Sequence, residues 1–189
     1  WEVTVIKDDK TMNAFALPGG KIAVYTGIFP VAKTEAGLAA VMGHEVVHAL
    51  ARHGGERMSQ NTLAQTTLQA IGIALGVSGA NPVVSQGAMA ALGVGAQVGV
   101  LLPFSRKHES EADYVGVLLA ADAGYDPRES IQLWTRMGEL SGGKSASEFM
   151  STHPSHETRI EQLEEWMAEA MPIYQSKPPA PNHELPALR

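Results

Sequence analysis

Two histidines and a glutamate within residues 44–48 form the part of the sequence best suited to chemistry. His44 and His48 are four residues apart, so in a helix their rings project from one face and can share one metal ion. Glu45 lies beside that face, where its carboxylate can reach a water molecule at the metal but is badly placed to be a ligand. This His-Glu-x-x-His pattern is typical of a zinc-binding helix. For these five residues alone, the alternative is a helix with two surface histidines.

A second helix, predicted over 105–123, offers a third ligand. Its two candidates are Glu109 and Glu111, which point to nearly opposite sides. We choose Glu109 because its face also carries Asp113, a carboxylate that can accept the second ring N–H of a ligating histidine. Without the upstream histidines, this segment would be interpreted as an ordinary acidic surface helix.

Small residues surround these candidates on both helices, so the two helices can pack closely. On the second helix they are Gly116, Ala120 and Ala123, and on the first helix they are Gly37, Ala40 and Ala51. We therefore expect the two faces to meet as the halves of one metal site.

Composition limits what kind of protein this is. The 189 residues are enough for one domain, expected over 1–172, followed by a proline-rich extended tail over 173–189. The net charge of −6 and the lack of a basic run argue against nucleic acid as a partner. The chain has no cysteine, so histidine and carboxylate must supply any metal ligands.

The remaining elements are predicted from pattern. Strands are expected at 1–6, 12–17 and 21–26, with a hairpin at Pro18-Gly19-Gly20. The first metal helix should begin after Thr34 and stop near His53, at Gly54-Gly55. Further helices are expected over 62–75 and 87–102, after Asp126, and after Arg159. The apolar run 88–104 looks too short and glycine-rich to span a bilayer comfortably, so we expect it to be buried or to cover the cleft. A membrane-facing role is the less favoured alternative.

The order of these motifs resembles the gluzincin metallopeptidases, and within them the HtpX/Oma/BepA-like family, relatives of the CAAX prenyl protease. The resemblance rests on four sequence features between residues 13 and 159: Asn-Ala-Phe-Ala-Leu-Pro-Gly-Gly at 13–20, the two-histidine motif at 44–48, Ser-Arg-Lys-His-Glu-Ser-Glu-Ala-Asp at 105–113, and His153-Pro154 with Arg159. It implies an α+β, mainly helical zincin-like domain with a small β-sheet whose edge strand flanks the active site.

The resemblance also implies residue roles. One Zn²⁺ would be held by His44, His48 and Glu109, with Glu45 catalytic and Asp113 and Arg159 supporting the site. His153 would lie near the open zinc position, either stabilising the oxyanion or capping the metal in a latent state. The strand residues that would align substrate are Asn13, Ala14, Phe15 and Ala16. Four histidines match no motif and are expected on the surface: His53, His108, His156 and His183.

The expected function is that of a zinc endopeptidase acting on extended or misfolded polypeptides. One alternative is a latent, chaperone-like zinc module whose own histidine blocks the site, and another is a hydrolase of non-peptide amides. Expected partners are polypeptide substrates and membrane-associated or envelope proteins. The resemblance implies a bacterial cell envelope or periplasmic location, with a targeting segment absent from this chain.

Overall fold

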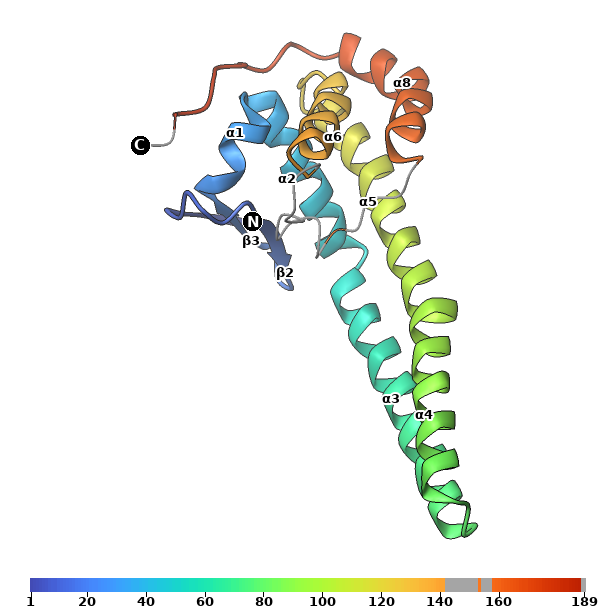
Figure 1. The fold of residues 1–189 in the computed structure, drawn as a ribbon. Helices are drawn as coiled ribbons and strands as arrows, with labels where there is room; N and C mark the ends of the chain where they lie inside the picture. The colour runs from blue at the N-terminus through green and yellow to red at the C-terminus, as the bar shows by residue number, and fades with distance from the viewer. Residues whose placement is uncertain (142–152, 154–157, 188–189) are drawn as a thin grey trace.

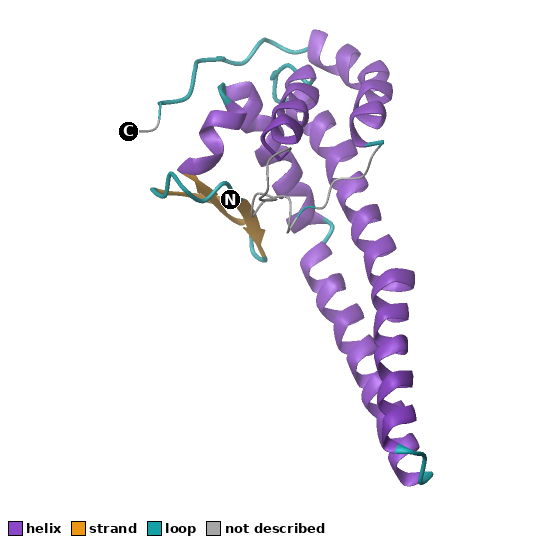
Figure 2. Ribbon diagram, in the orientation of Figure 1, coloured by secondary structure: helices purple, strands orange, loops and turns teal. Residues whose placement is uncertain are grey.

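The computed structural model describes residues 1–141, 153 and 158–187. These residues form a mainly helical fold with one small sheet, which confirms the predicted α+β class (Figures 1 and 2). The strands are β1 (Glu2–Ile6), β2 (Ala14–Leu17) and β3 (Lys21–Tyr25). The described helices are η1 (Thr26–Ile28), α1 (Phe29–Ala32), α2 (Glu35–Leu50), α3 (His53–Val77), α4 (Pro82–Ala96), η2 (Gln97–Leu101), α5 (Leu102–Asp122), α6 (Arg128–Ser141) and α8 (Arg159–Gln175).

The sheet has the order β1-β3-β2, so β2 is an edge strand. β3 runs parallel to β1 and antiparallel to β2, with Ala16 opposite Ile22. The hairpin turn lies at the predicted place, and Gly19 and Gly20 have φ of 88° and 77°, a conformation that suits glycine. β2 packs against α2, which brings the edge strand next to the His-Glu-x-x-His helix.

Helix α2 begins where the sequence predicts and ends earlier than predicted. Thr34 caps it by accepting a hydrogen bond from the Gly37 N–H at 3.1 Å. The predicted stop at Gly54-Gly55 is wrong, because the chain turns at Arg52 in a left-handed conformation and α3 starts at His53. A non-glycine residue makes the turn, so glycine positions alone could not locate it.

Helices α2 and α5 touch through their backbones at Gly43 and Gly116. A Cβ atom on Gly116 would lie 2.8 Å from the backbone nitrogen of His44, and one on Gly43 would lie 2.6 Å from the Gly116 carbonyl oxygen. Gly116 therefore belongs to the contact that its small-residue face predicted. Gly37 does not, because it packs against the Ala32 carbonyl oxygen at the end of α1.

The core lies between the sheet, α2, α6 and α8. It includes Leu133, Trp134 and Met137 of α6 and Leu163 of α8, which are all buried. Helix α8 continues through Pro172 to Gln175, so the extended tail begins after the boundary expected from sequence. The tail returns to the start of α2, where the Asn182 side-chain oxygen accepts a hydrogen bond from the Ala36 N–H at 2.9 Å.

Helices α3 and α4 form a hairpin that projects away from this core, and α5 runs back from α4 into it (Figure 1). The expectation that residues 87–102 are buried or cover the cleft is wrong: no residue of α4 is buried. The described chain contains one helical stretch, Pro82–Asp122, that is long and apolar enough to cross a membrane by length and composition. The apolar composition of this stretch predicts that it avoids water. Composition does not show whether the stretch packs in the core or projects from it.

Replacing Gly116 by alanine tests the backbone contact between α2 and α5. The added methyl group must push against the His44 backbone, so we expect Gly116→Ala to lower the free energy of unfolding by about 1–3 kcal/mol in chemical denaturation. Gly138→Ala is the matched control, because Gly138 is an exposed helical glycine with nothing within 4 Å of the added Cβ. The control should be neutral or slightly stabilising; equal effects at both positions would contradict the assigned contact.

Candidate metal centre

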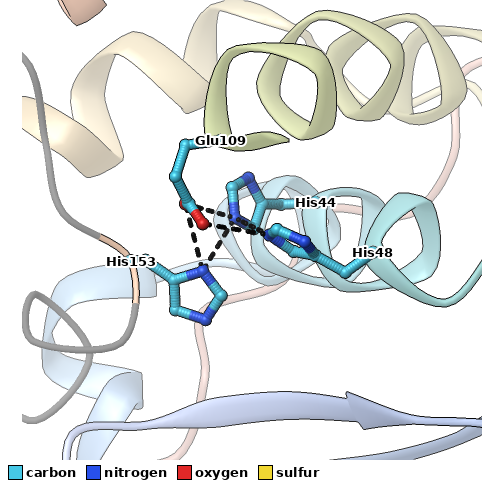
Figure 3. Close-up of side chains that lie close together, drawn as sticks. All are labelled: His44, His48, Glu109 and His153. Carbon is cyan, nitrogen blue, oxygen red and sulfur yellow. Dashed lines mark hydrogen bonds and ion pairs between the residues drawn. The ribbon is translucent and has the colours of Figure 1, made fainter. Parts of the chain in front are cut away.

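Four side chains from three parts of the chain converge on one point, as Figure 3 shows. His44 and His48 come from α2, Glu109 comes from α5, and His153 approaches from the opposite side. One ligand atom of each lies within 4.8 Å of the others. Glu109 is completely buried, whereas the Glu111 side chain is 51% exposed and points away. The structure thus brings together the three ligand candidates that we chose from the sequence.

The spacing of these atoms fits a bound divalent cation. The Nε2 atoms of His44 and His48 are 2.9 Å apart, and they lie 3.2 and 3.5 Å from the two carboxylate oxygens of Glu109. Ligand atoms about 2.0–2.1 Å from a tetrahedral metal are separated by about 3.3 Å. Among the described residues, Oε1 of Glu109 is buried and accepts no hydrogen bond. Converging lone pairs and a buried carboxylate oxygen without a donor are what a cation would satisfy.

Asp113 and Arg159 form hydrogen bonds that orient two of these four side chains, His44 and Glu109. Asp113 Oδ1 lies 2.8 Å from Nδ1 of His44, which turns the other ring nitrogen toward Glu109. Arg159 donates from Nε to Asp113 and from a terminal nitrogen to Oε2 of Glu109 at 3.2 Å. Its guanidinium carbon lies 3.5 Å from the centroid of Trp134, a cation–π contact. Trp134, a residue of the hydrophobic core, therefore also helps to orient Arg159.

Glu45 is buried beside the cluster and points to its open side. Its carboxylate accepts a hydrogen bond from the backbone N–H of Ala16, which ties it to the edge strand β2. Its Oε1 atom lies 3.3 Å from Nε2 of His153 and, within the described chain, accepts no hydrogen bond. A buried carboxylate with an unoccupied oxygen can accept a proton from water.

The two histidines of α2 are pushed toward opposite protonation states. Burial lowers the pKa of His44, but its hydrogen bond to Asp113 and the charges of Asp113 and Glu109 outweigh burial and raise the pKa to about 10. Burial and the nearby charge of His44 lower the pKa of His48 to about 2. Without a cation, His44 holds the proton and His48 stays neutral, so a bound metal takes the place of that proton.

The surroundings also shift the pKa values of the buried carboxylates in different directions. Burial raises the pKa of Glu45 above its ordinary value, although the charges of His153 and His44 oppose the shift. Burial acts the same way on Glu109, but hydrogen bonds from His153 and His44 outweigh it and hold its pKa well below the usual range. Burial also raises the pKa of Asp113, but the charges of Arg159 and His44 and their hydrogen bonds together outweigh it and lower that pKa. Glu109 is therefore kept anionic, as a metal ligand would need to be, while Glu45 is the carboxylate whose surroundings favour taking a proton.

Two histidines expected on the surface, His53 and His108, are buried instead, and that expectation is wrong. Nδ1 of His53 lies 2.9 Å from Nδ1 of His48, so His53 supports the second imidazole much as Asp113 supports the first. His108 stacks on His53 with ring centroids 4.3 Å apart and pairs with Glu56 at 3.0 Å. The sequence hinted at this contact only through the short distance along the chain, five residues, between His48 and His53. The turn at Arg52 brings the His53 ring back to the His48 ring.

The two other unmatched histidines do not enter the site. His183 is exposed as expected and lies 3.0 Å from Glu35. His156 lies outside the described residues.

A groove of about 350 Å³ lies between the end of β2 and the start of α3. Its lining includes Ala16, Leu17, His48 and Arg52. Of the strand residues expected to align substrate, Asn13 and Ala14 are buried, whereas Phe15 and Ala16 are half-buried. Among the described strands β2 pairs only with β3, so its second edge is available beside the metal centre. An extended peptide can pair with such an edge.

Known proteins match this chain over most of its length. Mitochondrial metalloendopeptidase OMA1 of Schizosaccharomyces pombe is 43% identical over 172 residues, covering 90% of this chain and 48% of the relative. The Saccharomyces cerevisiae OMA1 is 34% identical and covers 93% of this chain and 49% of the relative. A putative beta-barrel assembly-enhancing protease of Vibrio cholerae is 33% identical over 80% of this chain and 32% of the relative. The chain spans about half the length of these two yeast relatives and 33–37% of the length of the plant and animal OMA1 relatives.

These matches correct one expectation. A bacterial cell envelope or periplasmic location is wrong, because the relatives from two yeasts, a plant and several animals are named mitochondrial, and the bacterial matches cover less of the chain.

Peptidase family M48 matches residues 1–167, which include every ligand candidate, Glu45, Asp113 and Arg159. Together with the converging histidines and glutamate, this match shows that the chain belongs to peptidase family M48.

Proposed function

We propose that this chain is a zinc-dependent endopeptidase that cleaves extended or misfolded polypeptides. The observation that carries the proposal is the convergence of His44, His48 and Glu109 next to a buried Glu45 with an unoccupied oxygen. Two imidazoles and one carboxylate are the protein ligands of many catalytic zinc sites. The absence of cysteine and the family membership support the same assignment.

In the proposed reaction one residue of the chain transfers the proton, and two others keep the metal ligands in position. Zinc, when bound, supplies Lewis acidity that acidifies water and polarises the scissile carbonyl. Glu45 accepts a proton from the attacking water and delivers it to the leaving amide nitrogen, a task that suits its raised pKa. Asp113 and Arg159 keep the His44 ring and the Glu109 carboxylate in place while charge develops.

Polypeptide is the proposed substrate because of the edge strand. The hydrogen bond from Ala16 to Glu45 sets β2 directly beside the group that moves the proton, and the groove along β2 continues to His48. Main-chain pairing with a strand selects for extended chains and is tolerant of side chains. Asn13, Ala14, Phe15 and Ala16 would align the substrate in this way.

A latent form of the same site is the second candidate, and the position of His153 favours it. Nδ1 of His153 lies 3.1 Å from both Oε2 of Glu109 and Nε2 of His44, so it occupies the ligand cluster itself. A histidine in that place fills the fourth metal position and displaces water. Between the two roles expected for His153, capping therefore has more geometric support than oxyanion stabilisation.

Replacing Glu45 by glutamine tests the proton-transfer role. We expect zinc to remain bound, because Glu45 is not a ligand, and cleavage of unfolded casein to fall by about 10²–10⁴-fold. Glu165→Gln, on the exposed face of α8, is the matched control and should keep its activity. Undiminished cleavage by Glu45→Gln protein with normal zinc content would refute the assignment.

Metal removal tests the zinc requirement and its link to protons. Chelation should abolish cleavage, and zinc should restore it. Because His44 must release a proton to bind metal, apparent zinc affinity should fall as pH drops, by about tenfold per pH unit for one displaced proton. Titration calorimetry in buffers of different ionisation enthalpy measures the protons released. Chelator-insensitive cleavage would contradict the proposal.

Removing the His153 ring distinguishes its two roles. If His153 caps the metal, His153→Ala should raise the cleavage rate severalfold with zinc retained. If it stabilises the oxyanion, the rate should fall instead, and the latent form is then excluded. His183→Ala is the control, since its side chain is exposed on the tail away from the cluster.

A further inference from the structure

The hairpin of α3 and α4 has no role in the catalytic proposal, yet it is the most unusual surface of the molecule. Residues 58–105 contain no aspartate, glutamate, lysine, arginine or histidine. Large apolar side chains on the hairpin are nevertheless exposed, among them Leu63, Ile73, Val77, Val83 and Val84. An uncharged surface of this kind is rare on a protein that meets water on all sides.

Apolar residues of α4 point in every direction that α3 leaves free. The half-buried residues Ser85, Met89 and Gly93 share the face toward α3. Relative to Val83, the exposed Val84 lies about 100° around the helix, on the side away from α3, and the exposed Leu92 lies at about 180°, at the edge of the face toward α3. A docking surface for one protein partner would need a single apolar stripe, whereas an all-round apolar helix fits a lipid environment.

The polar groups of α3 are arranged to suit the same environment. The hydroxyls of Thr62, Thr66 and Thr67 each donate to the carbonyl oxygen four residues earlier at 2.8 Å, so they do not require water. Most amide side chains of α3 lie in its first half, next to the charged residues at the base of the hairpin.

Charged residues flank the base of the hairpin on both arms. Glu56 at the base of α3 pairs with His108 of α5 at 3.0 Å, which aligns the two arms. Arg57, whose half-exposed guanidinium also lies 3.8 Å from Oε1 of Glu109, stands at the end of one arm. Arg106 and Lys107 stand at the end of the other. In the described chain, Pro82–Asp122 is the helical stretch long and apolar enough to cross a membrane, whereas α3 carries Gln60, Asn61, Gln65 and Gln69. Residues 82–105 of this second arm are about 36 Å long, and the hydrocarbon core of a bilayer is about 30 Å thick.

We propose that residues 58–105 insert into a phospholipid bilayer as a hairpin that enters and leaves on one side. Arg57, Arg106 and Lys107 then lie at the headgroups, and the turn 78–81 reaches toward the far side. Glu109 follows Arg106 by less than one helical turn, about 4.5 Å along the axis. The insertion therefore holds the metal centre at the membrane surface, where it can meet polypeptide segments that emerge from the bilayer.

Depth-sensitive labels on the complete 189-residue chain test the insertion. The chain has no cysteine, so Val94→Cys carries a single environment-sensitive fluorophore midway between Pro82 and Arg106. Val3→Cys labels another exposed valine, on β1, as the control. With phosphatidylcholine vesicles, with and without phosphatidylglycerol, the Val94 label should shift to the blue and be quenched by brominated acyl chains, while the Val3 label stays unchanged.

A charge in the hairpin provides the second readout. Val94→Asp should weaken vesicle partition in flotation by roughly 100-fold, as expected for a charge near the bilayer centre, while Val3→Asp should partition like the parent chain. Circular dichroism checks that both variants remain folded. Three results would each overturn the proposal: no flotation of the parent chain, equal flotation of both variants, or protection of the Val94 label by self-association without lipid.

Discussion

The metal centre depends on how closely two helices approach each other. Gly43 and Gly116 let the backbones of α2 and α5 touch directly beside His44. Because Glu109 is on α5 and both histidines are on α2, no local folding of either helix can assemble the ligand set. A Cβ atom on either glycine would lie within 3 Å of the backbone of the other helix, so the two helices could not keep this approach without a shift.

Once the helices meet, buried charge has to be balanced. Isolated ions inside a protein cost several kcal/mol each. Here Arg159 sits between Asp113 and Glu109, and the ring of Trp134 covers its buried guanidinium. His44 contributes positive charge through its raised pKa, which a divalent cation would replace. The cluster is thus a balanced set of opposite charges, and its centre is the position suited to a metal.

The metal centre lies between two surfaces with different proposed partners. On one side the edge strand β2 reaches Glu45 through the Ala16 N–H and suits an extended chain. On the other side α3 begins at His53, which supports His48, and continues into the uncharged hairpin. If both proposals hold, a polypeptide would be held by the strand while the hairpin fixes the height of the site above lipid.

The sequence by itself determined the features that follow from helical and strand periodicity. Four-residue spacing placed His44 and His48 on one helical face. The same periodicity put Glu109 on the face of Asp113 and Glu111 on nearly the opposite face, which distinguished the two ligand candidates. Only the tertiary structure decided the burial of His53, the contact of Arg159 with Trp134, and the projection of the hairpin. Periodicity reports which face of an element avoids water. It does not report which distant element, or which solvent, covers that face, because those contacts depend on how the whole chain packs.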